Sequence, residues 1–399
     1  MSQRAEDLFH RASKVIAGGV NSFTRSQLAG WRPFPLFIRG GHGSRVQDSE
    51  GREFLDCIMG LGAVFPGHRE PTILEAVTRH IEQVGSVFAL PIEEEALAAE
   101  TLVRLVPTLE QVRFCNTGTE AILFAVRLAR KFTDRKKILT FEGMYHGFGD
   151  AVYFSKDRIV IPWNDTKSLD AAIDLHGTHL AAVLTEPIMC NRGYCASKPG
   201  YLNHLAERTR NNGSLLIFDE VITGFRAAIG GAQDLLGVQP DLTVLGKALG
   251  GGYPVACLGG STNIMQLVTD DRVRMMGTFS ANGIAVAAMI ASLQLYETSD
   301  NFKRVFNLGS AVREQLKQEV KDLGMPATVD GIGSVFQIHF NCDSKVDNKK
   351  LFEKWWQGML NRKILIHPDP NEVVFLSMAH IIDDVNYFID CARETLKSL

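Results

Sequence analysis

The chain has 399 residues, of which 45% are hydrophobic and 22% are charged, and its formal net charge is −3. That length predicts two or three structural domains around a large core, and the near-neutral charge gives no reason to expect nucleic-acid or membrane partners. The acidic amino terminus, the short apolar runs and seven scattered cysteines without a zinc-ligand set lead us to expect a cytoplasmic protein with no metal site.

The chain order of apolar and helical patterns predicts an α/β fold. Short strands are predicted at 36–38 and 45–47, followed by a series of largely apolar strands at 112–115, 137–141, 181–185, 215–218 and 242–245. Ala and Leu at helical spacing predict a helix over 119–131. Because strands with nearly continuous apolar runs are typical of a sheet covered on both faces, we expect a mostly parallel sheet in a large domain over residues 51–295.

The pattern changes after residue 296. An amphipathic helix is predicted over 301–323, and amphipathic strands are predicted at 334–340 and 373–378. These elements favour a smaller α+β domain over residues 296–399, and we expect residues 1–50 to pack with it.

The first polar feature that follows a strand is the segment 116–121, NTGTEA. Open sheets bind ligands at the carboxyl ends of their strands. Gly118 and Thr119 fall at the start of the predicted helix, where free N–H groups and the helix dipole favour an anion by ~0.3–1 kcal/mol. A phosphate suits this place, but the Thr-x-x-Glu spacing is also that of a helix cap.

The second feature is Asp219, which together with Glu220 follows the apolar run 215–218. A buried carboxylate is costly unless it meets a cation or strong hydrogen-bond donors. A protonated pyridine nitrogen is such a partner, and a metal-binding or helix-capping acid fits the position equally well.

The third feature is Lys247, which lies between the strand 242–245 and three glycines at 250–252. Most lysines are solvated surface charges, whereas a desolvated lysine at the end of a buried strand is a nucleophile towards aldehydes. A lysine imine opposed by a carboxylate on the ring nitrogen is the usual protein contribution to pyridoxal 5′-phosphate (PLP) chemistry. The three features together therefore predict one ligand, PLP.

Four segments carry a family resemblance: 116–121 (NTGTEA), 141–147 (FEGMYHG), 218–226 (FDEVITGFR) and 245–247 (LGK). Together they resemble the class III aminotransferases of PLP fold type I, and within that family most of all the glutamate-1-semialdehyde aminomutases. The resemblance runs from GGVNS at 18–22 to SMAH at 377–380. It implies a fold type I PLP-dependent transferase that forms a homodimer with shared active sites.

The resemblance also implies roles that spacing does not give. Tyr145 and Val221 match the residues on the two faces of the pyridine ring, and Asn191 matches an asparagine near the ring hydroxyl. His146, beside Tyr145, is included among the cofactor contacts. Outside this context Tyr145 is equally a core residue, and Asn191 an ordinary turn residue.

Three further residues are implied to act at the edge of the site. Thr278 matches a threonine that reaches the phosphate of the neighbouring subunit's cofactor. Arg25 matches the arginine that binds the substrate carboxylate in the aminomutases, and Glu372 matches an acid near their active site. Arg25 and Glu372 are equally compatible with ordinary surface charges.

The chain departs from the aminomutase pattern at three places. Most of the long Gly- and Ser-rich gating loop that follows Gly147 is missing. Gly60-Leu61 stands where the aminomutases have a Ser-Trp pair in the substrate pocket, and Ala281-Asn282-Gly283 replaces the usual Gly-Asn-Pro. The cofactor motifs are kept while the substrate walls differ.

We therefore predict a PLP-dependent aminotransferase that moves an amino group from a small-molecule amino donor to a carbonyl acceptor. A ping-pong mechanism through an imine on Lys247 is expected, with Asp219 keeping the ring nitrogen protonated. Glutamate-1-semialdehyde 2,1-aminomutase is the alternative within the class. A non-catalytic PLP-fold binding protein is the alternative from another class, and the lysine nucleophile argues against it.

Overall fold

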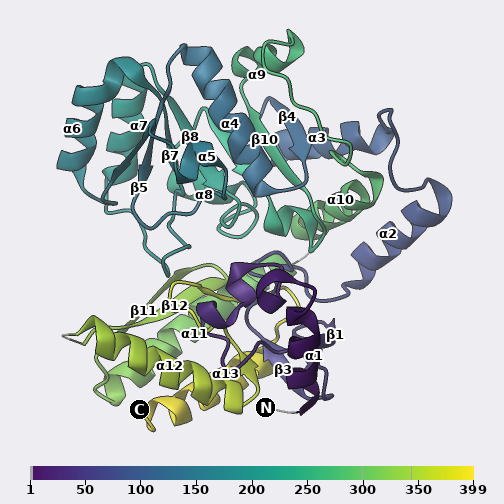
Figure 1. Cartoon of the computed structure of the whole chain (residues 1–399), viewed down its shortest axis with the longest axis vertical. Helices are drawn as coiled ribbons and strands as arrows, with labels where there is room; N and C mark the ends of the chain where they lie inside the picture. The colour runs from purple at the N-terminus through teal and green to yellow at the C-terminus, as the bar shows by residue number, and fades with distance from the viewer. Residues whose placement is uncertain (1–2, 299, 343) are drawn as a thin grey trace. The chain divides into compact units, whose positions relative to one another are not determined.

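The computed structural model describes residues 3–298, 300–342 and 344–399 (Figure 1). The chain forms two compact units. Unit 1 comprises Met1–Leu61, Pro66–Glu70 and Lys303–Leu399, and unit 2 comprises Gly62–Phe65 and Pro71–Phe302. Position 50, the expected domain boundary, lies inside unit 1 because strands β2 (Arg45–Asp48) and β3 (Glu53–Asp56) pair across it.

Unit 2 contains a seven-stranded sheet in the spatial order β4-β10-β9-β8-β7-β5-β6. Its strands are β4 (Gln111–Cys115), β5 (Lys137–Phe141), β6 (Arg158–Ile161), β7 (Leu180–Thr185), β8 (Leu215–Glu220), β9 (Leu242–Leu245) and β10 (Ala256–Gly260). Only β10 runs antiparallel to its neighbours within this sheet. The mostly parallel sheet is confirmed, and the carboxyl ends of the other six strands share one edge.

Helices cover both faces of this sheet, which explains why its central strands β7, β8 and β9 are buried at every position and mostly apolar. One face packs against α4 (Gly118–Thr133), α5 (Asp150–Tyr153) and α9 (Thr262–Thr269) through side chains such as Leu184 and Ile217. The other face packs against α6 (Thr166–His176) and α7 (Tyr201–Asn211) through Val183, Leu216 and Phe218. Adjacent residues of one strand thus enter different cores. The remaining helices of unit 2 are α2 (Pro71–Gln83), α3 (Glu93–Leu105), α8 (Gly231–Leu236) and α10 (Gly283–Thr298).

Unit 1 holds two smaller sheets. β1 (Ile38–His42), β2, β3 and β13 (Ile364–Leu365) form the first, in which β13 from the C-terminal part pairs in parallel with β3 from the N-terminal part. β11 (Ala327–Ile332), β12 (Val335–Phe340) and β14 (Val374–Phe375) form the second. The helices of this part of the chain are α1 (Gln3–Ser13), α11 (Asn301–Asp322), α12 (Lys345–Asn361) and α13 (Ile382–Leu396).

Two predicted strands of unit 1 differ from the observed ones. The strand expected at 36–38 begins only at Ile38, and its regular pairing lies over 40–42, where the glycines hide the strand pattern. The strand expected at 373–378 is limited to β14, because the chain turns back at Ser377, whose carbonyl accepts a hydrogen bond from the His380 N–H.

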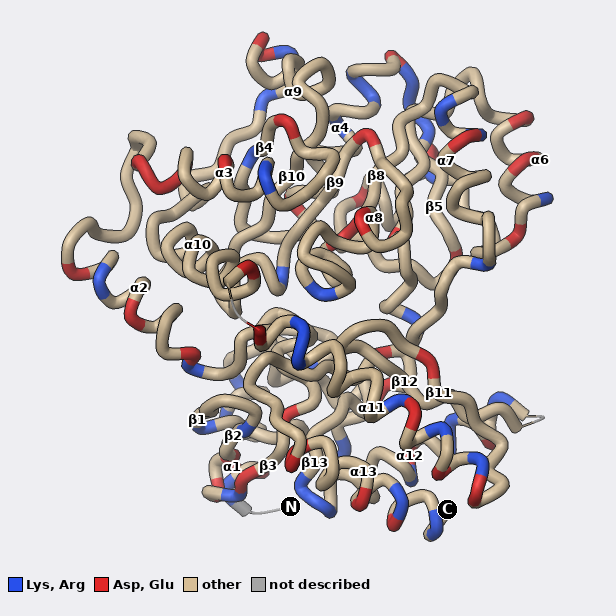
Figure 2. The backbone as a smooth tube through the Cα atoms, turned by 180° about the vertical axis from the view of Figure 1, so that it is seen from behind, with Lys and Arg blue, Asp and Glu red and all other residues tan. Residues whose placement is uncertain are grey.

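Acidic and basic residues are interspersed along the outer helices, as on α6 and α12 (Figure 2). Over the described ranges, no helix combines the length and apolar character that crossing a bilayer requires. The same residues contain no group of three His, Cys, Asp or Glu side chains placed to hold a metal ion.

Candidate active site

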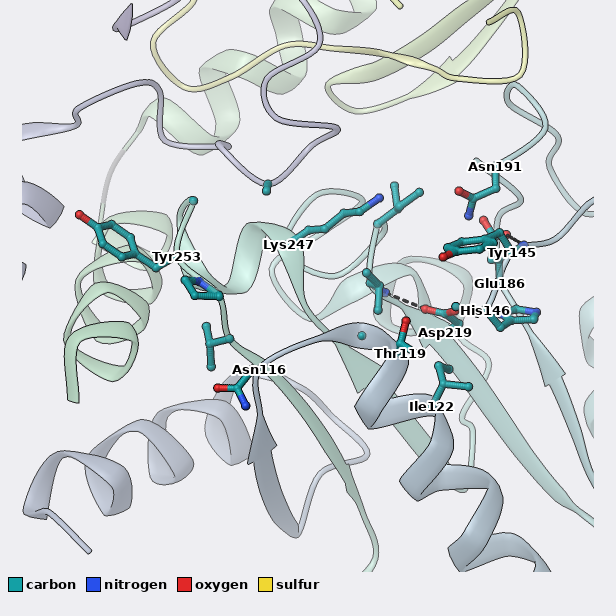
Figure 3. A pocket seen from close by; sticks show the side chains of 18 residues that line it. Asn116, Thr119, Ile122, Tyr145, His146, Glu186, Asn191, Asp219, Lys247 and Tyr253 are labelled. Carbon is teal, nitrogen blue, oxygen red and sulfur yellow. Dashed lines mark hydrogen bonds and ion pairs between the residues drawn. The ribbon is translucent and has the colours of Figure 1, made fainter. Parts of the chain in front are cut away.

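A cavity of about 390 Å³ in unit 2 opens at the carboxyl edge of the sheet (Figure 3). Loops that follow β4, β5, β7, β8 and β9 contribute side chains to its wall. Eight of the residues predicted to contact the cofactor line it: Gly118, Thr119, Tyr145, His146, Asn191, Asp219, Val221 and Lys247. The topology brings these residues together because parallel strands end at a common edge.

Asp219 lies near the end of β8 with its side chain in the cavity wall and is only 6% exposed. Its Oδ2 lies 2.8 Å from Nδ1 of the buried His146, and its Oδ1 accepts a hydrogen bond of 3.1 Å from the Val221 N–H. These contacts hold the carboxylate in one orientation towards the cavity.

The neighbouring Glu220 has a structural role at the start of α8. Its buried carboxylate accepts hydrogen bonds from the backbone N–H groups of Ala232 and Gln233 at 2.6 and 2.9 Å, and from the Thr223 hydroxyl at 2.8 Å. Burial raises the pKa of Glu220, and these donors oppose the rise. Glu220 is thus the helix-capping acid and Asp219 is the acid of the cavity.

Lys247 begins the short 3₁₀ helix Lys247–Gly250 directly after β9. Its backbone has a φ of 46°, in the left-handed region, which costs a non-glycine residue on the order of 1–3 kcal/mol. Asp219 pairs with Val244 across β8 and β9, so the acid and the lysine come from neighbouring strands. Figure 3 shows the lysine chain extending across the cavity towards the side that holds Tyr145 and Asn191.

The sequence allowed either a helix cap or a phosphate site at the amino terminus of α4, and the structure is compatible with both. Thr117 and Glu120 form a capping box: the Thr117 hydroxyl accepts from the Glu120 N–H, and the Glu120 carboxylate accepts from the N–H groups of Asn116 and Thr117. Among the described residues, this leaves the N–H groups of Gly118 and Thr119 without a hydrogen-bond acceptor. A helix start with two free N–H groups at a cavity is an anion site.

Close packing around α4 depends on two glycines. A Cβ atom on Gly118 would come within 2.9 Å of Val221, and one on Gly147 would come within 2.5 Å of the Thr119 hydroxyl. Gly147 also has a φ of 86°, which favours glycine. The turn that carries Tyr145 and His146 can therefore approach the helix start closely.

Glu186 lines the cavity and was not singled out as a site residue from the sequence. It follows β7 directly and is 3% exposed. Asp219 was singled out because it also lies at the end of a buried strand. Burial raises the pKa of Glu186 and so does the nearby charge of Asp219, while the His146 charge and hydrogen bonds from Cys190 and Asn191 lower it. A buried carboxylate at a strand end was the signal that could have identified it.

Three predicted residues lie elsewhere in the chain. Thr278 belongs to unit 2 but lies on an exposed loop between α9 and α10 and does not line the cavity. Arg25 ends the 3₁₀ helix Phe23–Arg25, where it is exposed, and Glu372 lies in the loop before β14. Both of these belong to unit 1.

Comparison with known proteins identifies the family of the chain. The family model for class III aminotransferases matches residues 27–153 and 154–389. The glutamate-1-semialdehyde 2,1-aminomutase of Desulfitobacterium hafniense is 36% identical over 426 aligned positions, which cover 100% of this chain and 99% of that protein.

Solved structures of transaminases superpose on almost the whole chain. An ω-transaminase from Sphaerobacter thermophilus is 33% identical with a TM-score of 0.92, covering 98% of this chain and 97% of its own. A structure described as a transaminase with PLP bound is 27% identical with a TM-score of 0.93, covering 100% and 98%. This chain therefore belongs to the class III aminotransferases, which are PLP-dependent enzymes of fold type I.

Proposed function

We propose that the cavity of unit 2 binds PLP and transfers an amino group from a small-molecule amino donor to a carbonyl acceptor by a ping-pong mechanism. The observation that carries this proposal is the meeting of Lys247 and the His146-supported Asp219 in one cavity. A protein that only bound the cofactor would need neither a lysine nucleophile nor a fixed carboxylate.

The residues of the cavity fit the chemical groups of PLP. The free N–H groups of Gly118 and Thr119 suit its phosphate, and the buried Asp219 carboxylate suits its pyridine nitrogen. Tyr145 and Val221 are proposed to cover the two ring faces, and Asn191 to meet the ring hydroxyl. Support comes from their position in the same cavity wall.

When bound, PLP supplies an aldehyde that condenses with amines and a ring that accepts electron density. Lys247 Nζ would hold the cofactor at its aldehyde carbon, and the same amine, once free, would move a proton at the substrate's reacting carbon. Asp219 keeps a proton on the ring nitrogen through charge pairing, and His146 keeps Asp219 in place. Arg25 and Glu372 are proposed to bind a carboxylate-bearing substrate or donor.

The short segment after Gly147 favours transamination over aminomutation. Only α5 and a turn separate Gly147 from β6. The alignment with the Desulfitobacterium hafniense aminomutase has 426 positions, whereas this chain has 399 residues. That relative therefore has segments that this chain lacks. An aminomutase must retain its intermediate, which a lid assists, whereas a transaminase must release one product before the second substrate enters.

Glutamate-1-semialdehyde 2,1-aminomutase is the second candidate, favoured by the 36% identity over the full length. Two assays on one preparation separate the two reactions. One follows glutamate-1-semialdehyde becoming 5-aminolevulinate with no other substrate, and the other follows donor-dependent amination of aldehydes and keto acids. We expect activity in the second assay. Efficient conversion in the first assay and none in the second would establish the aminomutase instead.

We further propose that the enzyme acts in the cytoplasm as a homodimer with shared active sites and without nucleic-acid or membrane partners. The exposed loop that carries Thr278 supports the dimer, because a residue outside its own cavity is free to reach a second one. Seven cysteines without a disulfide are compatible with a reducing compartment.

A further inference from the structure

Glu186 connects two loops that come from different strands. Its Oε1 accepts a hydrogen bond of 3.3 Å from the backbone N–H of Tyr145, in the loop after β5. Its Oε2 accepts a hydrogen bond of 2.8 Å from the backbone N–H of Cys190, in the loop after β7. Figure 3 shows the Glu186 carboxylate directly beside Tyr145 and His146.

The chain around Glu186 strengthens this connection. The Glu186 N–H and the Thr185 hydroxyl both lie against the sulfur of Met144, at 3.3 and 3.4 Å. The residue before Tyr145 is thus held to the end of β7 as well. Burial raises the pKa of the Glu186 carboxylate, and the nearby Asn191 side chain is among the groups that lower it.

We propose that Glu186 is a positioning residue of the PLP site, in which its carboxylate fixes the Tyr145 ring and the Asn191 amide in the places where they contact the cofactor. This inference rests on the proposed function of the same cavity. Tyr145 is 48% exposed, so packing covers only part of this residue. Glu186 acts through these two residues and need not touch the cofactor itself.

The chemistry of the position requires a carboxylate. Both of its oxygens accept hydrogen bonds from backbone N–H groups, and a carboxylate offers only acceptors. In Glu186→Gln, the amide nitrogen is a donor and must face one of these N–H donors. One loop then loses its partner, whichever way the amide turns.

The test compares Glu186→Gln with Glu142→Gln, which changes an exposed acid of the same loop. The PLP dissociation constant of each protein is measured by titrating the apoprotein, without substrate. We expect Glu186→Gln to bind PLP about 10- to 100-fold more weakly, as the loss of a buried hydrogen bond implies, and Glu142→Gln to bind as the wild type does. The visible circular dichroism of bound PLP should also change, because it reports the asymmetric contacts of the ring.

Three further measurements separate positioning from a role in the fold alone. The apoprotein of Glu186→Gln should melt within a few degrees of the wild type, and Glu186→Asp, which keeps both acceptors, should recover part of the affinity. In a double-mutant cycle with Tyr145→Ala, the two losses should be less than additive. An unfolded apoprotein, full additivity, or unchanged affinity and circular dichroism would overturn the inference. Wild-type transaminase activity is scored separately, so the proposed function stands or fails on its own assay.

Discussion

At the scale of single residues, environment separates side chains of the same type. Asp219 and Glu220 are adjacent and both buried, yet one carboxylate lies in the cavity and the other closes the start of α8. Successive residues of a strand point to opposite faces, so neighbours enter different surroundings. The sequence predicted that an acid would lie near the sheet interior. For this acid the sequence allowed a ligand partner or a helix cap. The first interpretation fits Asp219, and the second fits Glu220.

The first prediction concerns Lys247→Ala. Turnover should fall below detection because the substituted side chain has no amine to hold the cofactor or move the proton. The fold and much of the PLP affinity should remain, since the contacts at Gly118, Thr119 and Asp219 are unchanged. Borohydride reduction of the wild type followed by peptide mapping should find the cofactor on Lys247. Attachment to another lysine would contradict the assignment, and Lys167→Ala, an exposed lysine of α6, is the control.

The second prediction pairs Asp219→Asn with Glu220→Gln. Asp219→Asn should keep PLP bound but slow turnover by roughly 10²–10⁴-fold, the usual range for a lost proton-transfer contribution. Glu220→Gln should instead lower stability by about 1–3 kcal/mol, because its carboxylate serves several buried donors. Single-turnover kinetics and thermal melting measure the two effects. Near-normal turnover of Asp219→Asn would remove Asp219 from the mechanism.

At the scale of elements, the central sheet was the most predictable part of the fold. Strands such as β7 and β8 are buried over their whole length, so their apolar runs stand out from the flanking polar turns. The predicted strand 242–245 coincides with β9, and the predicted helix 119–131 lies within α4. Buried strands are predictable because both of their faces select for apolar side chains.

Strands that contain glycine, or that pair over only a few residues, were less predictable. β10 (Ala256–Gly260) went unnoticed, because the two glycines at its end, Gly259 and Gly260, have low strand propensity. Gly259 is required there, since a Cβ would come within 2.6 Å of Leu109. In the site, the positions of Lys247 and Asp219 were predictable because both residues lie at the ends of buried strands. The Glu186 contacts did not, because they depend on the path of two loops that no periodic pattern describes.

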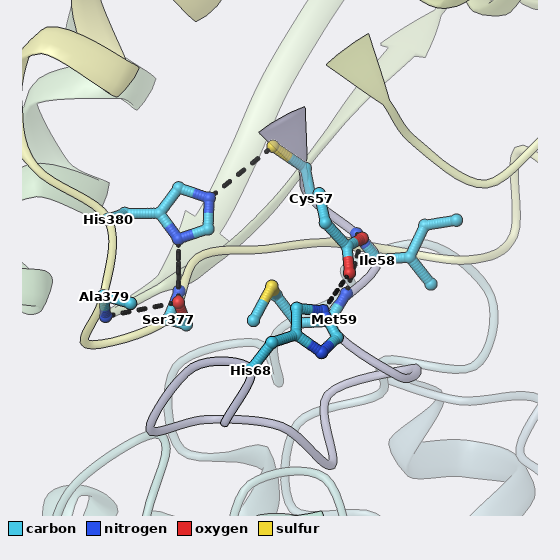
Figure 4. Close-up of polar contacts among 8 residues, drawn as sticks. Cys57, Ile58, Met59, His68, Ser377, Ala379 and His380 are labelled. Atoms are coloured by element: carbon cyan, nitrogen blue, oxygen red, sulfur yellow. Dashed lines mark hydrogen bonds and ion pairs between the residues drawn. The ribbon is translucent and has the colours of Figure 1, made fainter. Parts of the chain in front are cut away.

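The third prediction concerns the turn between β14 and α13 in unit 1. His380 accepts hydrogen bonds at Nδ1 from the Ser377 N–H and hydroxyl, at 3.0 and 2.9 Å (Figure 4). Its Nε2 therefore carries the proton and lies 4.0 Å from the Cys57 sulfur. His380 is fully buried, and burial lowers its pKa to about 4 against the opposing charges of Asp384 and Asp56.

The sign of the pH effect follows from proton uptake. Between its ordinary pKa near 6.5 and about 4, His380 is protonated in the unfolded chain and neutral in the folded one. Stability should therefore be complete above pH 6.5 and fall by about 3 kcal/mol as the pH decreases to 4. Melting curves of the wild type and His380→Gln over this range provide the measurement. The variant should have a flatter profile, and parallel profiles would contradict the assignment.

At the scale of the whole molecule, the cavity proposed to bind the cofactor belongs entirely to unit 2, whereas Arg25 and Glu372 belong to unit 1. The cofactor chemistry and the proposed substrate contacts are therefore carried by different parts of the chain. The four segments that carry the family resemblance lie in unit 2, and we expect the departures at Gly60-Leu61 and after Gly147 to affect substrate binding. With such a division, the substrate specificity can change while the cofactor chemistry stays the same.

The last prediction concerns assembly and depends on the position of Thr278. In a homodimer with shared sites, each cavity combines Lys247 from one copy with Thr278 from the other. Lys247→Ala should be inactive, and Thr278→Ala should bind PLP more weakly because the phosphate loses a hydrogen-bond donor. Each variant alone then has two defective cavities per dimer.

Mixing the two variants under conditions of subunit exchange should restore activity, because one cavity of each mixed dimer has both residues intact. Random exchange of equal amounts makes half of the dimers mixed, so about a quarter of the wild-type activity is expected for a two-fold symmetric dimer. Activity assays before and after exchange, with mass measurements of the mixed dimers, provide the test. If Thr278 acted within its own chain, no mixed dimer would contain an intact cavity and activity would stay at the level of the separate variants. A monomer in solution, or full activity of Thr278→Ala, would contradict the shared site equally.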